Sequence, residues 1–512
     1  MEHGVRAATA KRRIGGVDAA RGLALLAMMA IHILPGWNDE FEPTFSWLVF
    51  AGRGAALFAL LAGVSLAFMS GGHHPPQGKR MTAARLGLAV RAVLITVIGL
   101  LLGYLVINAQ VILVYYGVMF LLALPLLRLR ARTLLTLSAG IAVTAPVLMQ
   151  AARDSLADMG GVEPNFTTLA QSPGDVVGQV LLSGTYPALP WMAYVCAGLA
   201  VGRLDLAQRT VQLRLVFAGA GLAVLTAVLS SLLLGPFGGR EQLVDATSAW
   251  SASPEETVSD ILIWGPDPTL PTDSWWWLAT LTPYSSTPLV LLNTIGTVAA
   301  VLGVMLLLST AAGGLFKPLA VLGKMTLTLY SLHLLLLGTG MLEDQPHLCL
   351  FVQVVMVAAF AYIWQRFSSQ GPLERAVSEA SNWARRTYLA RVGQPGPGQP
   401  GLGQSGSGQP VPGHGAGGAP EPGPAAGAAR VPPPPPAPPS IRPAVQPSDT
   451  PSAQPSAAPS GTASATPSGT ASDRPGTAPS ATPPRVPSVA SSRRQALEAE
   501  GRGRHGINRQ GG

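Results

Sequence analysis

Stretches of mainly apolar residues recur along the chain as far as residue 365. A helix needs about 20 such residues to cross the hydrocarbon core of a bilayer, and ten stretches approach or reach this length. The pattern therefore predicts an all-α, polytopic membrane protein with about ten transmembrane helices. The ten stretches are Val17–Pro35, Trp47–Met69, Leu86–Ile107, Val111–Leu127, Leu134–Ala151, Pro187–Gly202, Leu213–Leu234, Leu289–Leu308, Leu319–Met341 and Leu348–Gln365.

The charges between these stretches predict the orientation of the chain. If the basic cluster Lys11–Arg13 is cytoplasmic, the loops on the same side carry most of the other basic residues. The opposite loops carry only Arg153 and Arg240, against sixteen acidic residues. Basic residues concentrate in cytoplasmic loops, so this bias supports a ten-helix alternation. We expect a multi-pass protein of the cell membrane with both termini in the cytoplasm.

The end of the chain has a different composition. No Phe, Trp or Tyr follows Tyr388, and 26 of the 46 prolines lie beyond Val392. Such a segment has too few apolar residues to build a core. We expect residues 1–16 to be a cytoplasmic segment, 17–366 the membrane domain, 367–392 an amphipathic helix at the membrane surface and 393–512 a disordered tail.

Composition excludes several functional classes. Only 12% of the residues are charged, about half the fraction typical of soluble domains. The two cysteines, Cys196 and Cys349, lie in apolar stretches, which argues against a disulfide framework and a cysteine-based metal site. The net charge of +8 is spread over the inner loops and the tail, so we expect no nucleic acid partner. We also expect no metal.

Ionisable residues at membrane depth are costly and are therefore functional candidates. The first stretch contains Asp18, Arg21 and His32. Arg21 and His32 are eleven residues apart, which places them on one stripe of a helix and roughly 16 Å apart. Arg21 could bind a phosphate by a bidentate contact, or pair with Asp18 on the same helix, and the two roles are compatible. The alternative for His32 is a neutral histidine that bonds between helices.

A second histidine, His333, lies at a similar depth in the ninth stretch. Thr326, Tyr330 and His333 are four and three residues apart and share one face of a continuous helix. Lys324 is nine residues from His333 and falls on the opposite face, so we expect an inner-surface role for it. His32 and His333 are the candidate catalytic residues.

Other polar side chains enter the membrane from the outer side, and a cation lies near the inner end of the third stretch. Tyr186 and Trp191 flank prolines that interrupt helical hydrogen bonding, which is tolerated at this depth only against protein or water. Either ring could instead anchor the chain at the membrane interface. Arg91 is a candidate to assist Arg21 or to snorkel towards the surface. The candidate substrate-binding residues are Arg53, Tyr186, Trp191, Tyr330 and Asn293.

Five short segments are similar to one family in their order and spacing. They are Val17–Ala24, Phe58–Ser65, Gly184–Trp191, Gly202–Asp205 and Leu327–His333. Together they resemble the heparan-alpha-glucosaminide N-acetyltransferase-like proteins and their bacterial YeiB-type relatives, from about Arg12 to Gln365. The spacing of Arg21 and His32 also resembles that of the acyltransferase-three family, whose first-helix histidine is tied to catalysis.

The resemblance implies a transmembrane acyltransferase with an acyl-CoA donor, in particular acetyl-CoA, on the cytoplasmic side. It implies an extracytoplasmic glycan, or another hydroxyl or amine, as acceptor. Arg21 and Arg91 would hold the donor, and the first-helix and ninth-helix histidines would serve the chemistry. In the animal enzyme the active-site histidine follows the first core helix, but Gly36–Ser46 contains no histidine. His32 is the nearest substitute.

Two further functions remain compatible with the residues. A proton-coupled transporter or permease could use the same histidines as a proton relay and would need no acyl-CoA. A non-catalytic scaffold could present the proline-rich tail. For the acyltransferase we expect the lipid bilayer and a glycan or lipid-linked acceptor as partners, and a homodimer is compatible with the sequence.

Overall fold

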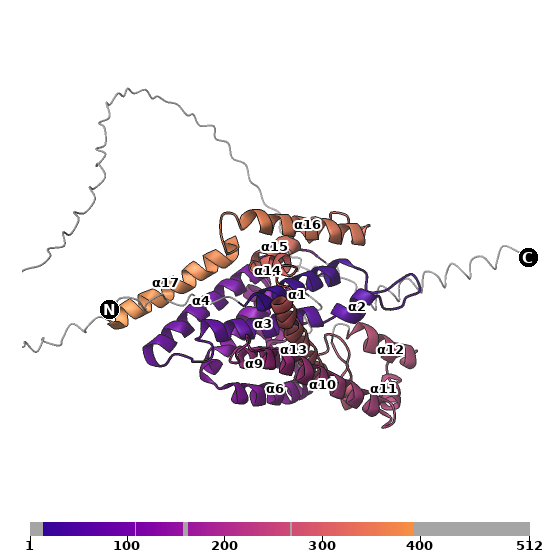
Figure 1. Ribbon diagram of the computed structural model, residues 1–512. Helices are drawn as coiled ribbons and strands as arrows, with labels where there is room; N and C mark the ends of the chain where they lie inside the picture. Colours follow the sequence, from indigo (N-terminus) through magenta and orange to yellow (C-terminus); the bar gives the residue numbers. More distant parts are fainter. Residues whose placement is uncertain (1–13, 108, 157–161, 267–268, 394–512) are drawn as a thin grey trace, which may run out of the picture. The chain divides into compact units, whose positions relative to one another are not determined.

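The computed structural model describes residues 14–107, 109–156, 162–266 and 269–393, which form one helical unit (Figure 1). Within these residues there is no strand, only an isolated bridge between Trp37 and Pro43. The predicted all-α class is therefore confirmed for the described part of the chain. The expectations for the first thirteen residues and for the tail from residue 394 lie outside it.

Seven helical segments of the described chain are long and apolar enough to cross a membrane. Each of the ten predicted stretches overlaps a helix or a pair of helices, but the count of ten spans is not confirmed. The seven are α1 (Gly15–Ile33), the pair α2 (Phe45–Phe50) and α3 (Arg53–Met69), α4 (Gly78–Leu102), α6 (Ala131–Ala152), α10 (Arg209–Leu234), α13 (Pro288–Ala311) and α16 (Pro346–Trp364).

The other three stretches depart from a simple span. The ninth is broken into α14 (Lys317–Gly323) and α15 (Thr326–Leu337), whose axes differ by 81°, so it makes an eighth span only if the bent pair is counted as one. The fourth and sixth form the shorter helices α5 (Leu113–Ala123) and α9 (Ala188–Val201). At 1.5 Å per residue these are too short to cross the bilayer alone.

Shorter elements connect the long helices, and α17 (Pro372–Gly393) follows the last one. Around η4 (Trp275–Ala279) a second, small hydrophobic core is present, in which Trp277 is fully buried against Leu243 and Val258. The connecting elements are η1 (Pro125–Arg128), η2 (Arg153–Ser155), α7 (Phe166–Gln171), α8 (Pro173–Gly178), η3 (Gln179–Ser183), α11 (Gly239–Thr247), α12 (Pro254–Trp264) and η4 (Trp275–Ala279).

Helix α1 packs against α3, α13 and α14, and small residues allow its backbone to approach α14 closely. A Cβ atom on Gly22 would lie 2.1 Å from the Leu319 carbonyl oxygen, and one on Gly323 would lie 1.7 Å from that of Asp18. Such close backbone contacts are typical of small residues between membrane helices. They place the break between α14 and α15 directly beside the start of α1.

Small residues also bring α3 and α9 close together. A Cβ atom on Gly63 would lie 2.3 Å from the Val195 carbonyl oxygen, and one on Gly198 would lie 1.9 Å from that of Leu60. Helices α3 and α9 are therefore in backbone contact, which accommodates the short α9 within the protein.

We expect Gly198→Leu to prevent this packing, because the new side chain has no space and the opposing backbone cannot move away cheaply. Overpacking typically costs about 1–3 kcal/mol and occasionally more. Gly221→Leu is the matched control, since a Cβ atom at Gly221 in α10 would meet nothing within 4 Å. The measurement is the midpoint of thermal unfolding in detergent. Equal midpoints for the two variants would contradict the predicted packing.

Arg203 explains one of the segments that carried the family resemblance. It is buried and donates hydrogen bonds to the carbonyl oxygens of Gly72 and Leu127 and, at 3.3 Å, to the Ser70 hydroxyl. The side chain thus joins the end of α9 to the segments that follow α3 and α5. This is a structural role, in which the fixed fork of the guanidinium satisfies several acceptors.

Candidate active site

The principal cavity of the described chain has a volume of about 460 Å³ and is bounded by α1, α3, α4, α5, α15 and α17. Four cations line it together with apolar and aromatic side chains. Arg21 and Ser65 face each other at one end, while Met28 and Phe58 lie two turns further along the same two helices. The cavity therefore has a cationic end and an aromatic end. The cations are Arg21, Arg91, Lys324 and Arg385.

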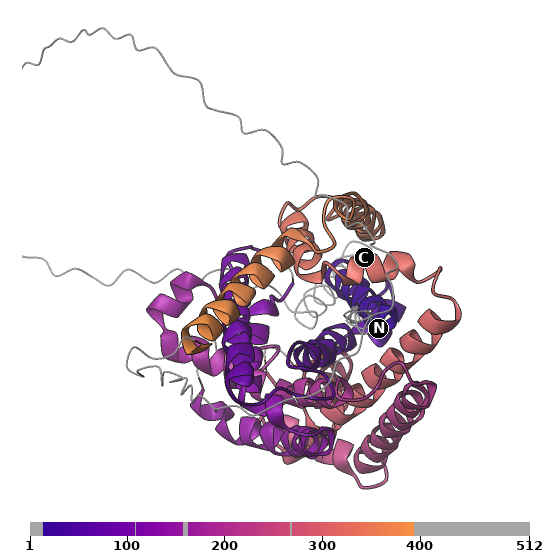
Figure 2. The same cartoon turned by 60° about the vertical axis from the view of Figure 1, so that its left-hand side comes forward.

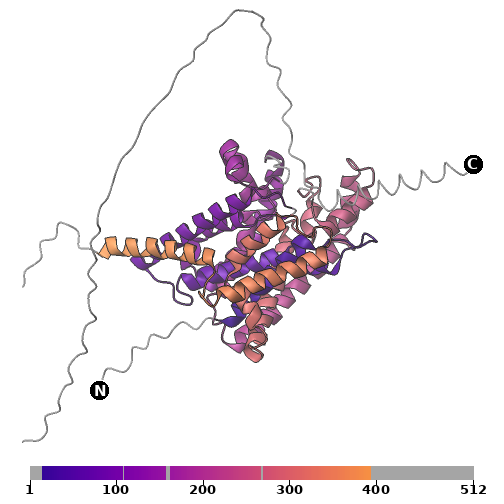
Figure 3. The same ribbon diagram turned by 90° about the horizontal axis from the view of Figure 1, so that it is seen from above.

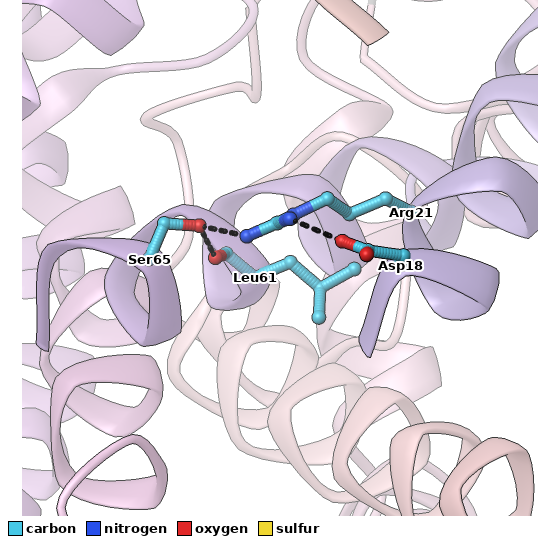
Figure 4. Close-up of polar contacts among 4 residues, drawn as sticks. All are labelled: Asp18, Arg21, Leu61 and Ser65. Atoms are coloured by element: carbon cyan, nitrogen blue, oxygen red, sulfur yellow. Dashed lines mark hydrogen bonds and ion pairs between the residues drawn. The ribbon is translucent and has the colours of Figure 1, made fainter. Parts of the chain in front are cut away.

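Arg21 forms the expected pair with Asp18 and a second contact with α3. Its guanidinium pairs with the Asp18 carboxylate at 2.9 Å and donates to the Ser65 hydroxyl, which in turn donates to the Leu61 carbonyl at 2.6 Å (Figure 4). Figure 4 shows the guanidinium held between α1 and α3. Arg21 also lines the cavity, so the pair with Asp18 orients the cation without removing it from the cavity.

The second predicted donor residue, Arg91, lies on α4 and lines the same cavity. Its buried Nε atom has no hydrogen-bond partner among the described residues. Arg91 interacts electrostatically with Arg21 and with Glu374 of α17. The structure thus brings both predicted donor-site arginines to one cavity, where their charges repel unless an anion lies between them.

Lys324 lies in this cavity as well, and the expectation that it would face away was wrong. That expectation assumed one continuous helix from Lys324 to His333. The helix breaks at Lys324 and Met325, and the 81° bend between α14 and α15 cancels the angular relation of 100° per residue. A third cation therefore joins Arg21 and Arg91.

The two histidines contact each other. The His32 Nδ1 atom lies 3.1 Å from the His333 Nε2 atom, and the ring centroids are 5.4 Å apart with an angle of 8° between the ring planes, which suits a hydrogen bond between the two ring edges. His333 is 0% exposed, and its Nδ1 atom lies 2.8 Å from the Gln353 Oε1 atom on α16. Three polar side chains from α1, α15 and α16 thus form a continuous chain of hydrogen bonds.

The direction of these hydrogen bonds follows from Gln353. Its amide nitrogen donates to the Cys349 sulfur at 3.5 Å, and the Cys349 thiol donates to the Met341 carbonyl at 3.4 Å, so the amide oxygen faces His333. The His333 Nδ1–H therefore donates to Gln353, and its Nε2 accepts from the Nδ1–H of His32. The His32 Nε2 atom keeps its lone pair and can act as a base.

Tyr330 connects the cavity to the histidine pair. Its ring lines the cavity and lies 6.4 Å from the His32 ring. Its hydroxyl donates to the Gln110 carbonyl at 3.3 Å and accepts from the Ile112 backbone N–H at 3.4 Å. Met28, one helical turn before His32, also lines the cavity. The aromatic end of the cavity thus reaches the immediate surroundings of His32.

Three of the other predicted substrate residues lie in a separate, smaller cavity of about 70 Å³. There Arg53 donates to the Leu48 carbonyl at 2.5 Å, Trp191 donates to the Ser286 hydroxyl at 3.1 Å, and Asn293 donates to the Ala223 carbonyl at 2.8 Å. Tyr186 is buried, with its ring 5.1 Å from that of Trp191. The structure therefore does not bring these four residues to the cavity of Arg21.

Burial also bears on the alternative for the two rings. Tyr186 and Trp191 are each 3% exposed, so neither ring faces the membrane interface, as an anchor would. Their edge-to-face contact is a packing interaction inside the helical unit.

Two polar residues, one beside His333 and one beside the segment that holds Tyr330, were not among the predicted site residues. Gln353 is a neutral amide inside an apolar stretch, and its presence there was the signal that could have identified it. Glu163 precedes α7 and accepts a hydrogen bond from the Val111 N–H at 3.1 Å. Burial raises the pKa of the Glu163 carboxyl to about 8, so it is largely protonated at neutral pH. It supports the Gln110–Ile112 segment that also holds the Tyr330 hydroxyl.

Comparison with known proteins gives a match for the first part of the chain. Residues 13–233 match the sequence model of the heparan-alpha-glucosaminide N-acetyltransferase catalytic domain. Comparison with curated protein sequences gives no significant match. Arg21, His32, Ser65 and Arg91 lie within the matched residues, whereas His333 and α17 lie beyond them. The expected resemblance is thus confirmed: residues 13–233 are similar to the catalytic domain of the heparan-alpha-glucosaminide N-acetyltransferases.

Proposed function

We propose that the protein is a transmembrane acyltransferase. It takes an acetyl group from cytoplasmic acetyl-CoA and transfers it to a hydroxyl or amine of an extracytoplasmic glycan or lipid-linked acceptor. The observation that carries this proposal is the cavity that joins a cluster of cations to the surroundings of the His32–His333 pair. The family match supports the acetyltransferase class of the reaction.

The two ends of the cavity suit the two ends of an acyl-CoA. Guanidinium groups bind phosphates through charge-assisted hydrogen bonds, and Arg21 and Arg91 would hold the phosphate end of the donor. Apolar side chains such as Leu61 and Ala62, which lie between Ser65 and Phe58 along α3, line the cavity between its ends and would contact the pantetheine arm. The thioester would then lie near Tyr330, within reach of the acceptor at His32.

The hydrogen-bond directions support the following proton transfers. The His32 Nε2 atom removes the proton from the acceptor, whose oxygen or nitrogen attacks the thioester carbonyl carbon. The new bond forms as the carbon–sulfur bond breaks, and the departing sulfur takes the proton from the His32 imidazolium. His333 stabilises this cation through its Nε2 lone pair, and Gln353 holds His333 in the required tautomer. In an alternative order, His32 carries the acetyl group before the acceptor attacks.

The bias of basic residues supports one orientation of this reaction across the membrane. The cationic end of the cavity would face the cytoplasm, together with both termini, and His32 would lie towards the outside. This placement supports a role in the modification of cell-envelope glycans at the cell membrane. The bilayer and the acceptor would be the principal partners, and a homodimer is compatible with the proposal.

A proton-coupled transporter is the second candidate, because the same chain from His32 through His333 to Gln353 could relay protons. Labelled acetyl-CoA and a panel of cell-wall and lipid-linked glycans, added to the purified protein in nanodiscs, distinguish the two. The acyltransferase predicts labelled glycan and free CoA in equal amounts. Counterflow of a solute in liposomes that lack acetyl-CoA, without any acetyl transfer, would instead establish the transporter.

A further inference from the structure

Helix α17 lies beyond the family match and runs along α4 at the edge of the helical unit (Figures 2 and 3). The Ser381 hydroxyl donates to the Gly87 carbonyl of α4 at 2.7 Å. The stem of Arg385 covers Gly87, where an added Cβ atom would lie 2.6 Å from the Arg385 Cγ atom. Val377 and Ala384 are buried in the same face. The helix is therefore packed in place and is not only a surface appendage.

Glu374 joins α17 to the helix of the histidine site. Its Oε1 atom accepts hydrogen bonds from the backbone N–H groups of Leu327 at 2.7 Å and Thr328 at 3.2 Å, and its Oε2 atom accepts from the Thr328 hydroxyl. These N–H groups lie in the first turn of α15, where a helix offers its own backbone donors no acceptor. The N-cap residue of α15 makes no side-chain cap, so Glu374 takes its place. The charge of Glu374 is thus used to stabilise the helix that carries Tyr330 and His333.

One face of α17 forms a wall of the cavity. Glu374, Ser378, Ser381 and Arg385 line the cavity and are spaced by three or four residues, which places them on one stripe. The exposed Arg386 lies on another face of the helix. Within the described part of the chain, the Arg385 guanidinium has no ion pair.

The charges at the cationic end do not balance. Four cations line the cavity, whereas two carboxylates accompany them: Glu374, which is bonded to the start of α15, and Asp18, which is paired with Arg21. Cations gathered in a partly enclosed space repel each other and attract an anion with several charges. Two of them, Lys324 and Arg385, lie outside the part of the chain that matches the family.

On the basis of the proposed function, we propose that α17 binds the nucleotide end of the donor, with Arg385 and Lys324 contacting its phosphates. Arg385 would thereby select thioesters of CoA over thioesters that lack the nucleotide, such as acetyl-pantetheine. A phospholipid head group would offer the same phosphate chemistry, so the test must separate the two sources.

The test compares Arg385→Ala with the wild-type protein in nanodiscs of zwitterionic lipid. We expect KM for acetyl-CoA to rise about tenfold, the usual scale for the loss of a charge-assisted contact, with kcat unchanged. KM for acetyl-pantetheine should remain as in the wild type. Arg386→Ala, the exposed neighbour, is the matched control and should alter neither donor. Calorimetry with free CoA and with pantetheine gives a readout independent of turnover. Arg385→Ala should weaken the binding of CoA and leave the binding of pantetheine unchanged.

Three results would overturn the inference: an unchanged KM for acetyl-CoA, an equal loss for both donors, or an effect seen only with anionic lipid. An equal loss for both donors would show that α17 only supports the cavity. An effect seen only with anionic lipid would show that Arg385 binds a lipid head group. Failure of the proposed function has a different signature, since the wild-type protein would then transfer from neither donor. The binding of CoA by the two proteins would still decide the role of Arg385.

Discussion

Replacing His32 by alanine should lower the rate of acetyl transfer by about 10²- to 10⁴-fold, the range typical of a lost general base. The effect should fall on kcat, because His32 does not line the donor cavity and the cations that would hold acetyl-CoA remain in place. The measurement is the initial rate of glycan acetylation in nanodiscs, normalised to folded protein. The binding of CoA, followed by calorimetry, should be unchanged.

His347→Ala is the matched control for this variant, because His347 is an exposed histidine in the first turn of α16. It removes an imidazole without touching the site and should retain the wild-type rate. Full activity of His32→Ala, measured beside this control, would eliminate both the general base and the covalent route through His32.

Replacing Gln353 by alanine should lower kcat by about 10- to 100-fold, the scale found when the orienting partner of a histidine is lost at metal sites. Without the amide oxygen, His333 is free to carry its proton on Nε2, and the Nδ1–H of His32 then loses its acceptor. KM for acetyl-CoA should be unchanged, since Gln353 does not line the donor cavity. The matched control is Met356→Ala, on an exposed face of α16.

Gln353→Glu separates this positioning role from a structural one. A carboxylate accepts the same hydrogen bond from His333 Nδ1 and should restore much of the rate that alanine loses. Its negative charge would also favour the protonated form of the histidine pair. The limb of the pH–rate profile that reports the titration of this pair should therefore shift to higher pH. A glutamate variant as inactive as the alanine variant, with an unshifted profile, would contradict the assigned tautomers.

The sequence predicted the helices well because membrane insertion requires long apolar stretches that are visible without any tertiary information. It also predicted that His32 and His333 lie at similar depth, since depth follows from position along a helix. It could not predict their contact across 301 positions, because the rotation of one helix about its axis relative to another depends on packing. The close approach of α1 and α14 at Gly22 and Gly323 provides that packing.

Lys324 and Arg53 show what periodicity and depth leave out. Lys324 was assigned to the wrong face because a break within an apolar stretch leaves little trace in the pattern, yet here it turns the chain by 81°. Arg53 was favoured because it is a cation at membrane depth. Its guanidinium, which is partly exposed, donates to the carbonyl oxygens of Leu48 and Val49 in α2, which is another way to satisfy a charge at this depth. Depth alone does not separate a cation that binds substrate from one that bonds to the backbone.

Gln353 was missed for a related reason. A search for ionisable residues passes over a neutral amide, although a buried amide also requires partners. Its importance lies in which atom faces His333, and this depends on Cys349 and Met341, residues with no polar signature in the sequence.

The central claim is that one cavity connects a donor on one side of the membrane to an acceptor on the other. Liposomes containing the purified protein, with glycan acceptor enclosed and radiolabelled acetyl-CoA added outside, test it directly. Molecules oriented with Arg21 outwards should place label on the enclosed glycan, while CoA is released outside and no acetyl-CoA enters. Label that reaches the glycan only when donor and acceptor share a compartment would contradict the account.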